Sequence, residues 1–265
     1  MLQTGAKEIV LTGVNMSRYR DGALRFQDLV GRLLDLEGDF RLRISSLEPD
    51  RDSHGLAELF AHPKMTPHLH LCLQSGSDRM LRAMRRLYSY DQFAATVGLL
   101  RKRRPDINLT TDIIVGFPGE SDTDLDRTLQ AIEDLEFGHV HTFPYSEREG
   151  TRAVQMPGAI PHYIRTARAA EVRKAAEKSK HRYRRQLVGC TERLLVERYE
   201  GGERAVACGL GEHYVPIRAT AAPAATSSKT GAAQVRDIPA QNTFVDVEVT
   251  AVSECSDHSL IGRVV

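Results

Sequence analysis

The sequence predicts an α/β fold, a partial (βα) barrel of parallel strands, followed by a small all-β barrel. Three observations predict it. β-prone runs alternate with helical patterns through residues 1–158, small or polar residues follow each of those runs, and β-branched segments at short spacing fill residues 186–265. Regular βα alternation implies parallel strands with right-handed crossovers. Polar residues at the carboxyl ends of such strands are typical of barrel active sites.

The composition is that of a soluble globular protein, with 41% hydrophobic and 27% charged residues in a chain of 265. No apolar run approaches the roughly 20 residues of a membrane helix, and the N-terminus lacks a signal-peptide pattern. We therefore expect a cytoplasmic monomer with no membrane partner. The net charge of +1 argues against a strongly basic nucleic-acid binder, but an average can conceal a local basic patch.

The cysteines predict no metal centre. They are widely scattered and form neither CxxC nor CxxxCxxC, so no zinc or iron–sulfur ligand set can be assigned from them. Buried free thiols are the interpretation that we favour. The four are Cys72, Cys190, Cys208 and Cys255.

Each of the first three predicted strands ends in small or polar residues. Glu8–Leu11 ends at Thr12-Gly13-Val14-Asn15, Arg41–Ser45 leads into Ser46-Leu47-Glu48-Pro49, and His68–Leu73 is followed by Gln74-Ser75-Gly76-Ser77. Helical patterns separate these strands. They run through Leu29–Leu34, Leu56–Phe60, Met80–Met84 and Phe93–Leu100.

The stretch LTTDIIVGFPGE, residues 109–120, is the clearest strand–turn–helix unit. Its apolar run predicts a strand buried on both faces, which breaks at Gly116 into a tight turn. The glycines of that turn allow the backbone to approach whatever lies above the end of the strand. Ser121 then opens a helical pattern that reaches Leu135, and a fifth strand, His139–Phe143, ends at Pro144-Tyr145-Ser146.

Histidines alternate on two of the predicted strands and so share a face in each. His68, His70 and Cys72 lie on one strand, and His139 and His141 on another. An HxH pair on a barrel strand is typical of a divalent-metal hydrolase, which needs further ligands at other strand ends. Asp112 and Glu48 are the available carboxylates. Histidines that merely fill the barrel interior are the alternative.

From Pro161 to about Arg185 the pattern predicts one long helix rich in Lys and Arg. Few acids compensate them towards its end, which favours contact with phosphate. A solvated surface helix is the alternative. Beyond it, a five-stranded barrel fits, and such small barrels often bind oligonucleotides. The strands predicted for it are residues 191–199, 205–209, 213–217, 243–252 and 260–265, with a flexible loop at 219–241.

The strand-end motifs together resemble the radical-SAM methylthiotransferases. LTGVN, RISSLEP, HLHLCLQSGSDRMLRAMRR, TTDIIVGFPGE and HTFPYSEREGTRA occur in that order. LQSGSD and IIVGFPGE at this spacing are specific together, although either alone would be weak. SSLEP is most similar to the subgroup that acts on threonylcarbamoyladenosine in tRNA. GLGEHYVPI and the final LIGRVV resemble the TRAM RNA-binding domain, so the resemblance covers nearly the whole chain.

The resemblance implies a partial radical-SAM barrel over residues 1–158, a basic linking helix over 159–185 and a TRAM-like barrel over 186–265. It implies that S-adenosylmethionine is bound at the strand ends. Arg85 and Arg86 could balance the cofactor carboxylate. The common pattern GxIxGxxE is met only loosely, because Glu120 falls one place late. The cofactor-binding residues implied are Gly13, Asn15, Ser45, Ser46, Glu48, Gln74, Ser75, Asp112, Gly116, Phe117, Pro144 and Tyr145.

Members of that family also carry an N-terminal cluster domain and a CxxxCxxC loop that holds a [4Fe–4S] cluster. Neither is in this sequence, so we expect the C-terminal portion of such an enzyme, with its cluster ligands outside the chain and no activity alone. No catalytic residue is assigned. The implied partners are an electron donor and the anticodon stem-loop of tRNA, bound by Lys180, Arg182, Arg184, Arg185, His213 and Tyr214.

Three other interpretations remain open from the sequence. The chain could be a non-catalytic RNA-binding remnant. It could be a sister methylthiotransferase that acts on isopentenyladenosine in tRNA or on a ribosomal protein. The third is the metal hydrolase that the histidine pairs suggest.

Overall fold

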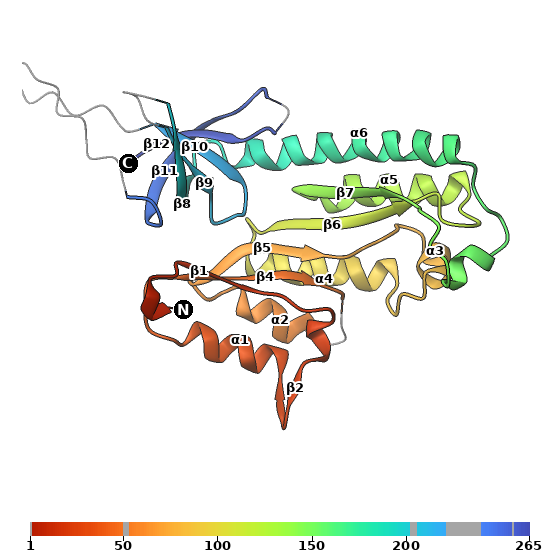
Figure 1. Ribbon diagram of the computed structural model, residues 1–265, viewed down its shortest axis with the longest axis horizontal. Helices are drawn as coiled ribbons and strands as arrows, with labels where there is room; N and C mark the ends of the chain where they lie inside the picture. The colour runs from red at the N-terminus through yellow and green to blue at the C-terminus, as the bar shows by residue number, and fades with distance from the viewer. Residues whose placement is uncertain (1, 50–52, 202–205, 221–239, 256) are drawn as a thin grey trace, which may run out of the picture. The chain divides into compact units, whose positions relative to one another are not determined.

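The structure is a computed structural model that describes residues 2–49, 53–201, 206–220, 240–255 and 257–265 (Figure 1). The chain divides into two compact units. One comprises residues 10–36 and 42–183, and the other comprises residues 1–9, 37–41 and 184–265. The expected boundaries at residues 158 and 185 differ from this division, because two early segments of the chain belong with the C-terminal unit.

A five-stranded sheet in the order β1-β4-β5-β6-β7 forms the centre of the first unit. The pairs β4–β5, β5–β6 and β6–β7 are parallel, so the carboxyl ends of these strands gather at one edge. The open sheet confirms the predicted partial barrel. Its strands are β1 (Glu8–Leu11), β4 (Arg41–Leu47), β5 (Met65–Leu71), β6 (Asn108–Val115) and β7 (His139–Pro144).

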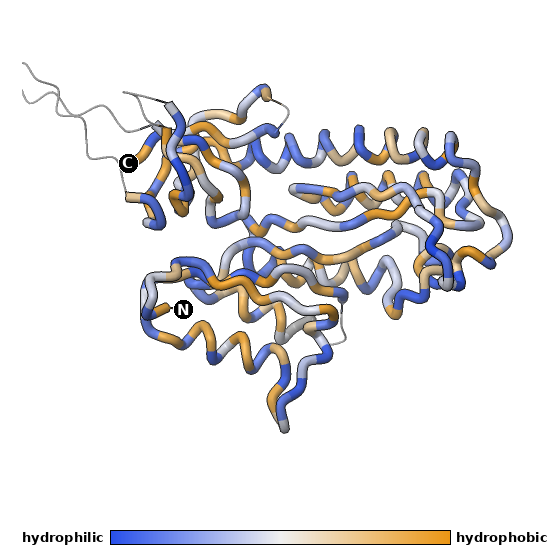
Figure 2. The backbone as a smooth tube through the Cα atoms, in the orientation of Figure 1, coloured by the Kyte–Doolittle hydropathy of each residue, from blue (hydrophilic) through white to orange (hydrophobic). Residues whose placement is uncertain are grey.

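Helices connect the strands, as the βα alternation predicts. Each predicted helix is present, and a small hairpin of β2 (Arg20–Asp21) and β3 (Leu24–Arg25) occupies the loop after β1. Hydrophobic and hydrophilic positions alternate along the longest helix, α6 (Figure 2). The helices are α1 (Phe26–Leu34), α2 (Ser53–Leu59), α3 (Asp78–Ala83), α4 (Tyr90–Arg103), α5 (Asp122–Leu135) and α6 (His162–Gln186), and the 3-10 turns are Leu2–Thr4, Met16–Arg18 and Arg152–Gln155.

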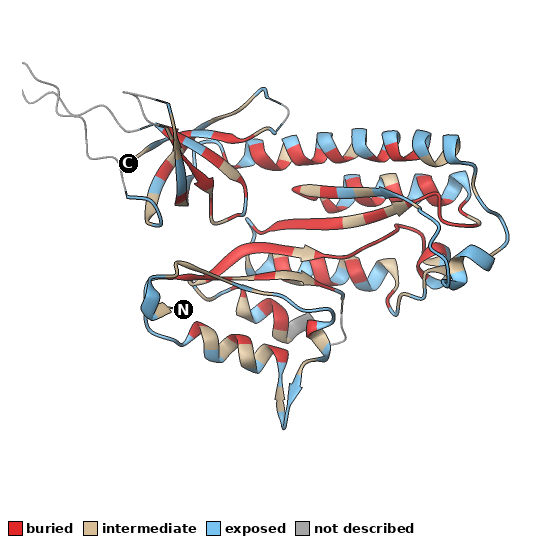
Figure 3. Cartoon of the chain, in the orientation of Figure 1, coloured by how far each residue is buried: buried red, intermediate tan, exposed pale blue. Residues whose placement is uncertain are grey.

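The two faces of the sheet differ in character. β5 and β6 are buried along most of their length (Figure 3). On one face Leu69, Leu71 and Ile113 are fully buried, and Phe93 of α4 meets Phe137 with ring centroids 6.1 Å apart. Since successive side chains on a strand alternate, His70 and Asp112 lie on the opposite face. The helix-covered face therefore supplies the apolar core and the other face carries polar side chains.

A closed barrel in the order β10-β12-β11-β8-β9 forms the second unit and confirms the predicted small β-barrel. One strand was predicted too early, because the segment from His213 to Val215 is a turn in which Tyr214 has φ +57°. The loop predicted over 219–241 lies mostly outside the described residues, and 219–220 belong to β10. The strands are β8 (Thr191–Glu200), β9 (Val206–Leu210), β10 (Pro216–Thr220), β11 (Phe244–Val252) and β12 (Leu260–Val264).

Early residues of the chain complete this barrel unit. Arg41 is almost fully buried and its Nε lies 2.6 Å from Oε2 of Glu8. Its guanidinium also donates to the carbonyl oxygens of Arg193 and Leu210, both at 3.3 Å. One arginine thus ties segments 1–9 and 37–41 to two barrel strands. Among the described helices, none is long and apolar enough to cross a membrane.

Candidate functional site

Backbone hydrogen bonds join the strand ends at the carboxyl edge of the parallel sheet. The Gln74 N–H donates to the Asp112 carbonyl at 2.8 Å, and the Ile114 N–H donates to the Gln74 carbonyl at 3.0 Å. The Tyr145 N–H donates to the Val115 carbonyl at 2.8 Å. Segments that follow β5 and β7 are therefore held directly against β6. Three of the expected cofactor-binding residues lie together in this way.

Gln74 itself has an unusual backbone. Its φ is +69°, in the left-handed region that non-glycine residues rarely adopt. Such conformations persist where the surrounding structure enforces them, and they concentrate at ligand sites. The two hydrogen bonds to β6 supply that enforcement. Gln74 is therefore the strand-end residue that the backbone geometry singles out.

Ser75, also expected in the cofactor site, is engaged elsewhere. Its Oγ lies 3.3 Å from Oγ1 of Thr128 on α5 and accepts the Ser77 N–H at 3.2 Å. The Gly76 N–H donates to the same Thr128 oxygen at 3.1 Å. The structure thus gives Ser75 a packing role between the β5 end and α5.

The β4 end carries a charged pair. Glu48 forms an ion pair with Arg86, so the charge of Arg86 is already balanced by a carboxylate of the protein. The Nε of Arg86 is nevertheless buried without a hydrogen-bond partner among the residues that the structure describes. Ser46 Oγ lies 3.7 Å from Cys72 Sγ. This end of the sheet therefore keeps one donor that a bound polar group could satisfy.

The residues that follow β1 are more open. Gly13 and Asn15 are both exposed, and Asn15 Oδ1 accepts a hydrogen bond from Ser17 Oγ at 2.9 Å. Of the other expected residues, Ser45 is half-buried and Pro144 is exposed. No contact joins these four to the Gln74–Asp112 pair among the described hydrogen bonds.

The glycine turn after β6 lies close to other parts of the chain. Gly116 and Gly119 have φ of +70° and +82° and need to be glycine for that reason. A Cβ on Gly116 would collide with the side-chain stem of Arg165 on α6. The Gly119 N–H donates to the Gly158 carbonyl at 2.8 Å. The space above the turn is thus occupied by residues 158–165.

A buried ion pair fixes that turn. Glu120 Oε2 accepts the Gly116 N–H at 2.8 Å and lies 2.8 Å from Nη1 of Arg168 on α6. Burial raises the pKa of Glu120 in spite of these two hydrogen bonds. Sequence reasoning missed the pair, because nothing in the pattern of α6 marks Arg168 as buried rather than solvated.

A small cavity of about 110 Å³ lies beside the turn. Its lining includes Pro118, Tyr145, Met156 and Arg165. The Tyr145 ring packs edge-on against Phe117, with centroids 5.2 Å apart. Tyr145 Oη and Arg165 Nε are both buried without a hydrogen-bond partner. Buried polar atoms without partners are uncommon and point to a missing ligand or water.

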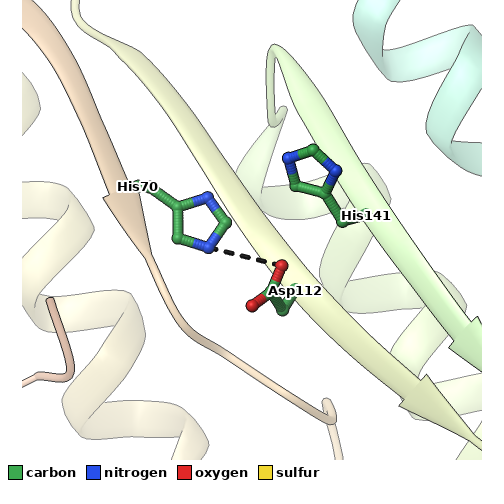
Figure 4. Close-up of side chains that lie close together, drawn as sticks. All are labelled: His70, Asp112 and His141. Atoms are coloured by element: carbon green, nitrogen blue, oxygen red, sulfur yellow. Dashed lines mark ion pairs between the residues drawn. The ribbon is translucent and has the colours of Figure 1, made fainter. Parts of the chain in front are cut away.

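The polar face of the sheet carries three converging side chains from three neighbouring strands (Figure 4). His70 of β5, Asp112 of β6 and His141 of β7 each bring one ligand atom within 4.8 Å of the other two. His70 Nε2 and Asp112 Oδ1 are 3.4 Å apart. The structure therefore brings together one member of each predicted histidine pair and the predicted carboxylate. Glu48, the other carboxylate considered, is not among them.

The two histidines of this cluster differ in charge tendency. Burial lowers the pKa of His70, but hydrogen bonds with Asp112 and Cys72 outweigh it and raise that pKa to about 9. The pKa of His141 is lowered by burial and by the neighbouring His70 charge. Asp112 is half-buried and His141 is exposed, so solvent reaches both. The cluster can hold a proton or a cation.

Most of the basic residues expected to contact RNA have internal partners. Lys180 lies 3.3 Å from Glu177, and Arg182 pairs with Glu133 of α5 and with Glu136, which follows that helix. Arg184 is buried and donates to backbone carbonyls at Asp257 and His258. His213 is buried against Glu192. Arg185 and Tyr214 are the exposed members of the expected set.

The cysteines do not converge. Cys72 and Cys208 are buried, whereas Cys190 and Cys255 are exposed, and all four are free thiols. Within the described part of the chain, no cysteine joins a group of metal-ligating side chains. These thiols therefore do not fit a shared iron–sulfur cluster.

Comparison with known proteins gives a consistent result. A family model described as the Radical SAM superfamily matches residues 2–132. The threonylcarbamoyladenosine tRNA methylthiotransferase MtaB of Thermotoga maritima is 39% identical over 217 residues, which cover 81% of this chain and 50% of that protein. The tRNA-2-methylthio-N(6)-dimethylallyladenosine synthase of Endomicrobium trichonymphae is 36% identical over 76% of this chain and 49% of its own length.

A further relative extends the match over almost the whole chain. The tRNA-2-methylthio-N(6)-dimethylallyladenosine synthase of Nitrosomonas eutropha is 31% identical over 98% of this chain and 56% of that protein. The chain thus spans about half the length of the curated relatives it matches. Among solved structures, coproporphyrinogen III oxidase (HemN) of Escherichia coli aligns with a TM-score of 0.48 and 14% sequence identity. The alignment covers 70% of this chain and 50% of that protein.

Proposed function

Because residues 2–132 match the Radical SAM superfamily model and most of the chain is similar to tRNA methylthiotransferases, we propose that the chain takes part in methylthiolation of an adenosine in tRNA. The similarity to MtaB over 81% of the chain is the observation that carries the proposal. The chain would supply the barrel part of the active site and a β-barrel that contacts RNA.

S-adenosylmethionine is the cofactor of the proposed reaction, and when bound it supplies the radical chemistry of the superfamily. The carboxyl edge of the parallel sheet fits such a group, because it offers buried polar atoms without partners at Arg86, Tyr145 and Arg165. Gln74 and Asp112 would orient it at the centre of that edge. Gly13, Asn15, Ser45 and Pro144 would line its open side.

A [4Fe–4S] cluster belongs to the same chemistry, but the cysteines of this chain do not fit one. We therefore assign no residue to it. We propose that its ligands, and the electron donor that reduces it, are separate from the residues described.

For the substrate, we propose threonylcarbamoyladenosine beside the anticodon. The support is the SSLEP motif together with MtaB of Thermotoga maritima and of Treponema pallidum, which are 39% and 41% identical. The dimethylallyladenosine synthases have comparable identities, so dimethylallyladenosine is the second candidate. Arg185 and Tyr214 would contact the RNA, because they are exposed whereas the other expected residues contact groups within the protein.

Analysis of tRNA nucleosides tests both levels of this proposal. Deletion of the gene that encodes the chain is expected to remove the methylthio group from threonylcarbamoyladenosine, as detected by mass spectrometry, and reintroduction is expected to restore it. Loss from dimethylallyladenosine instead would identify the second substrate. Unchanged methylthiolation of both nucleosides would refute the proposed function.

A further inference from the structure

Three metal-ligating side chains converge on the polar face of the parallel sheet, one from each of three adjacent strands (Figure 4). Backbone pairing fixes their spacing, because Asp112 of β6 is in register with His141 of β7. Two imidazoles and one carboxylate are a donor set that suits zinc and non-haem iron(II). We propose that His70, Asp112 and His141 bind one divalent first-row transition-metal ion.

The distances suit a shared ion. Metal–nitrogen and metal–oxygen bonds of about 2.0–2.2 Å place neighbouring ligand atoms roughly 3.0–3.5 Å apart. His70 Nε2 and Asp112 Oδ1 already have a separation of 3.4 Å. The rings of His70 and His141 are 5.6 Å apart between centroids and inclined by 50°. Since His141 is exposed, rotation of its side chain can bring its nitrogen to the ion without moving a strand.

A neighbouring hydroxyl orients the first of these ligands. Thr110 Oγ1 lies 3.0 Å from Nδ1 of His70 and 3.3 Å from Nε2 of His68. Ligand histidines in metal sites commonly hold their second ring nitrogen in such a hydrogen bond, which leaves the other nitrogen for the metal. With Nδ1 held by Thr110, Nε2 of His70 is the atom that faces Asp112.

The surroundings define the kind of site. Three protein ligands leave at least one coordination position for water or another ligand, as in catalytic rather than structural zinc sites. Asp112 and His141 are reached by solvent, so an ion can enter. The inference goes beyond the proposed tRNA modification. Asp112 is shared with the proposed cofactor site, but the metal site is tested with metal ions alone and therefore stands or falls independently of that function.

Titration of the metal-free chain with Co²⁺ and Zn²⁺ tests the site. Cys190→Ser and Cys255→Ser in the background remove the exposed thiols. We expect one ion per chain, with a visible Co²⁺ absorption band and no thiolate charge-transfer band. Asp112→Asn and His141→Ala should each weaken binding about tenfold or more, a loss typical of damaged metal sites. His162→Ala, which removes an exposed histidine at the start of α6, should leave the affinity unchanged.

A second group, Glu192, Glu212 and His213, is the internal competitor in the barrel unit. Loss of binding in Glu212→Gln, with full affinity in His141→Ala, would move the ion to that group and overturn the assignment. Absence of binding in the unsubstituted chain would overturn it as well. Circular dichroism checks each variant for folding. If Asp112→Asn fails to fold, His141→Ala and His141→Gln decide the question, since an exposed side chain can be replaced without loss of core packing.

Discussion

Asp112 and Glu120 are two carboxylates on one strand–turn segment, and their surroundings give them different roles. Glu120 is buried, accepts the Gly116 N–H and pairs with Arg168. Asp112 is half-buried beside His70 and His141 on the open face. A fully bonded buried carboxylate fixes the turn, whereas an accessible one beside imidazoles remains available to a ligand.

The charge on His70 should be measurable directly. Its pKa is raised to about 9, so in metal-free protein its imidazole proton should be lost near that pH when followed by NMR. A raised pKa means that the pair with Asp112 stabilises the fold fully below about pH 6.5 and loses this contribution as the pH rises through about 9. In Asp112→Asn the pKa of His70 should fall, because the hydrogen bond and the charge of Asp112 that raise it are lost. An unchanged titration in that variant would contradict the assigned cause.

For single residues, the sequence predicted which side chains belong to the candidate site better than it predicted which groups each side chain contacts. His70, His141 and Asp112 were all singled out, because their spacing on strands is local information. Arg184 was expected on RNA and is buried against backbone carbonyls, while Arg168, which the sequence placed only on a long helix rich in Lys and Arg, secures Glu120. Both outcomes depend on residues more than 40 positions away, which no local pattern reveals.

Among the elements, α5 has a strongly bonded start. Asp124 accepts hydrogen bonds from Ser121 and Ser77 and forms an ion pair with Arg79. Burial alone would raise the pKa of Asp124, but hydrogen bonds from Arg79, Ser121 and Ser77 hold it well below its usual value. This makes the first turn of α5 a link between α3 and the glycine turn.

Asp124→Asn should therefore lower the free energy of unfolding by about 1–2 kcal/mol at pH 7. Because the pKa of Asp124 is lowered in the folded protein, its ionised carboxylate stabilises the fold at pH values above the usual pKa of 3.8. This stabilisation is lost as the pH falls below that value. The difference from the unsubstituted chain in urea denaturation should thus shrink below about pH 4. Asp126→Asn, at an exposed position of the same helix, is the matched control and should change little.

The connection between β5 and α3 requires a glycine. A Cβ at Gly76 would lie 2.8 Å from the Arg127 carbonyl carbon and from the Thr128 Cα, both backbone atoms of α5. Gly76→Ala should cost about 1–3 kcal/mol in denaturant unfolding, because the loop must move away from the helix. Gly98→Ala, in open space within α4, should instead stabilise the fold by up to about 1 kcal/mol. Equal effects of the two changes would refute the packing argument.

Helices and strands were predicted well where the spacing of hydrophobic residues alone determines them. All five sheet strands and six helices follow from apolar spacing and turn residues. The exception in the barrel is the turn at His213–Val215, which alternates like a strand. The His213 side chain points inward to Glu192, and Tyr214 has a left-handed backbone conformation. Strand pairing therefore begins only at Pro216. The buried contact between His213 and Glu192 overrides the local β propensity there.

At the level of the whole molecule, the unit that contains the barrel is discontinuous in sequence. Arg41→Ala should lower its stability by about 3–5 kcal/mol, because the substitution breaks the largely buried ion pair between Arg41 and Glu8. Hydrogen exchange along β8 and β9 would report the loss. Arg218→Ala removes a surface ion pair with Glu200 and should cost less than about 1 kcal/mol. The sequence could not reveal this unit, since residues 1–9 and 37–41 have the pattern of ordinary sheet and loop segments.

This discontinuity has a consequence for biosynthesis. Residues 1–9 leave the ribosome before the whole parallel sheet, whereas residues 184–265, with which they form one compact unit, are made after it. During translation Glu8 and Arg41 are made early, whereas the carbonyl groups of Arg193 and Leu210 that Arg41 also contacts are made only after the sheet is able to fold. Closure of the barrel unit then joins segments far apart in sequence, which makes it a slow, late step.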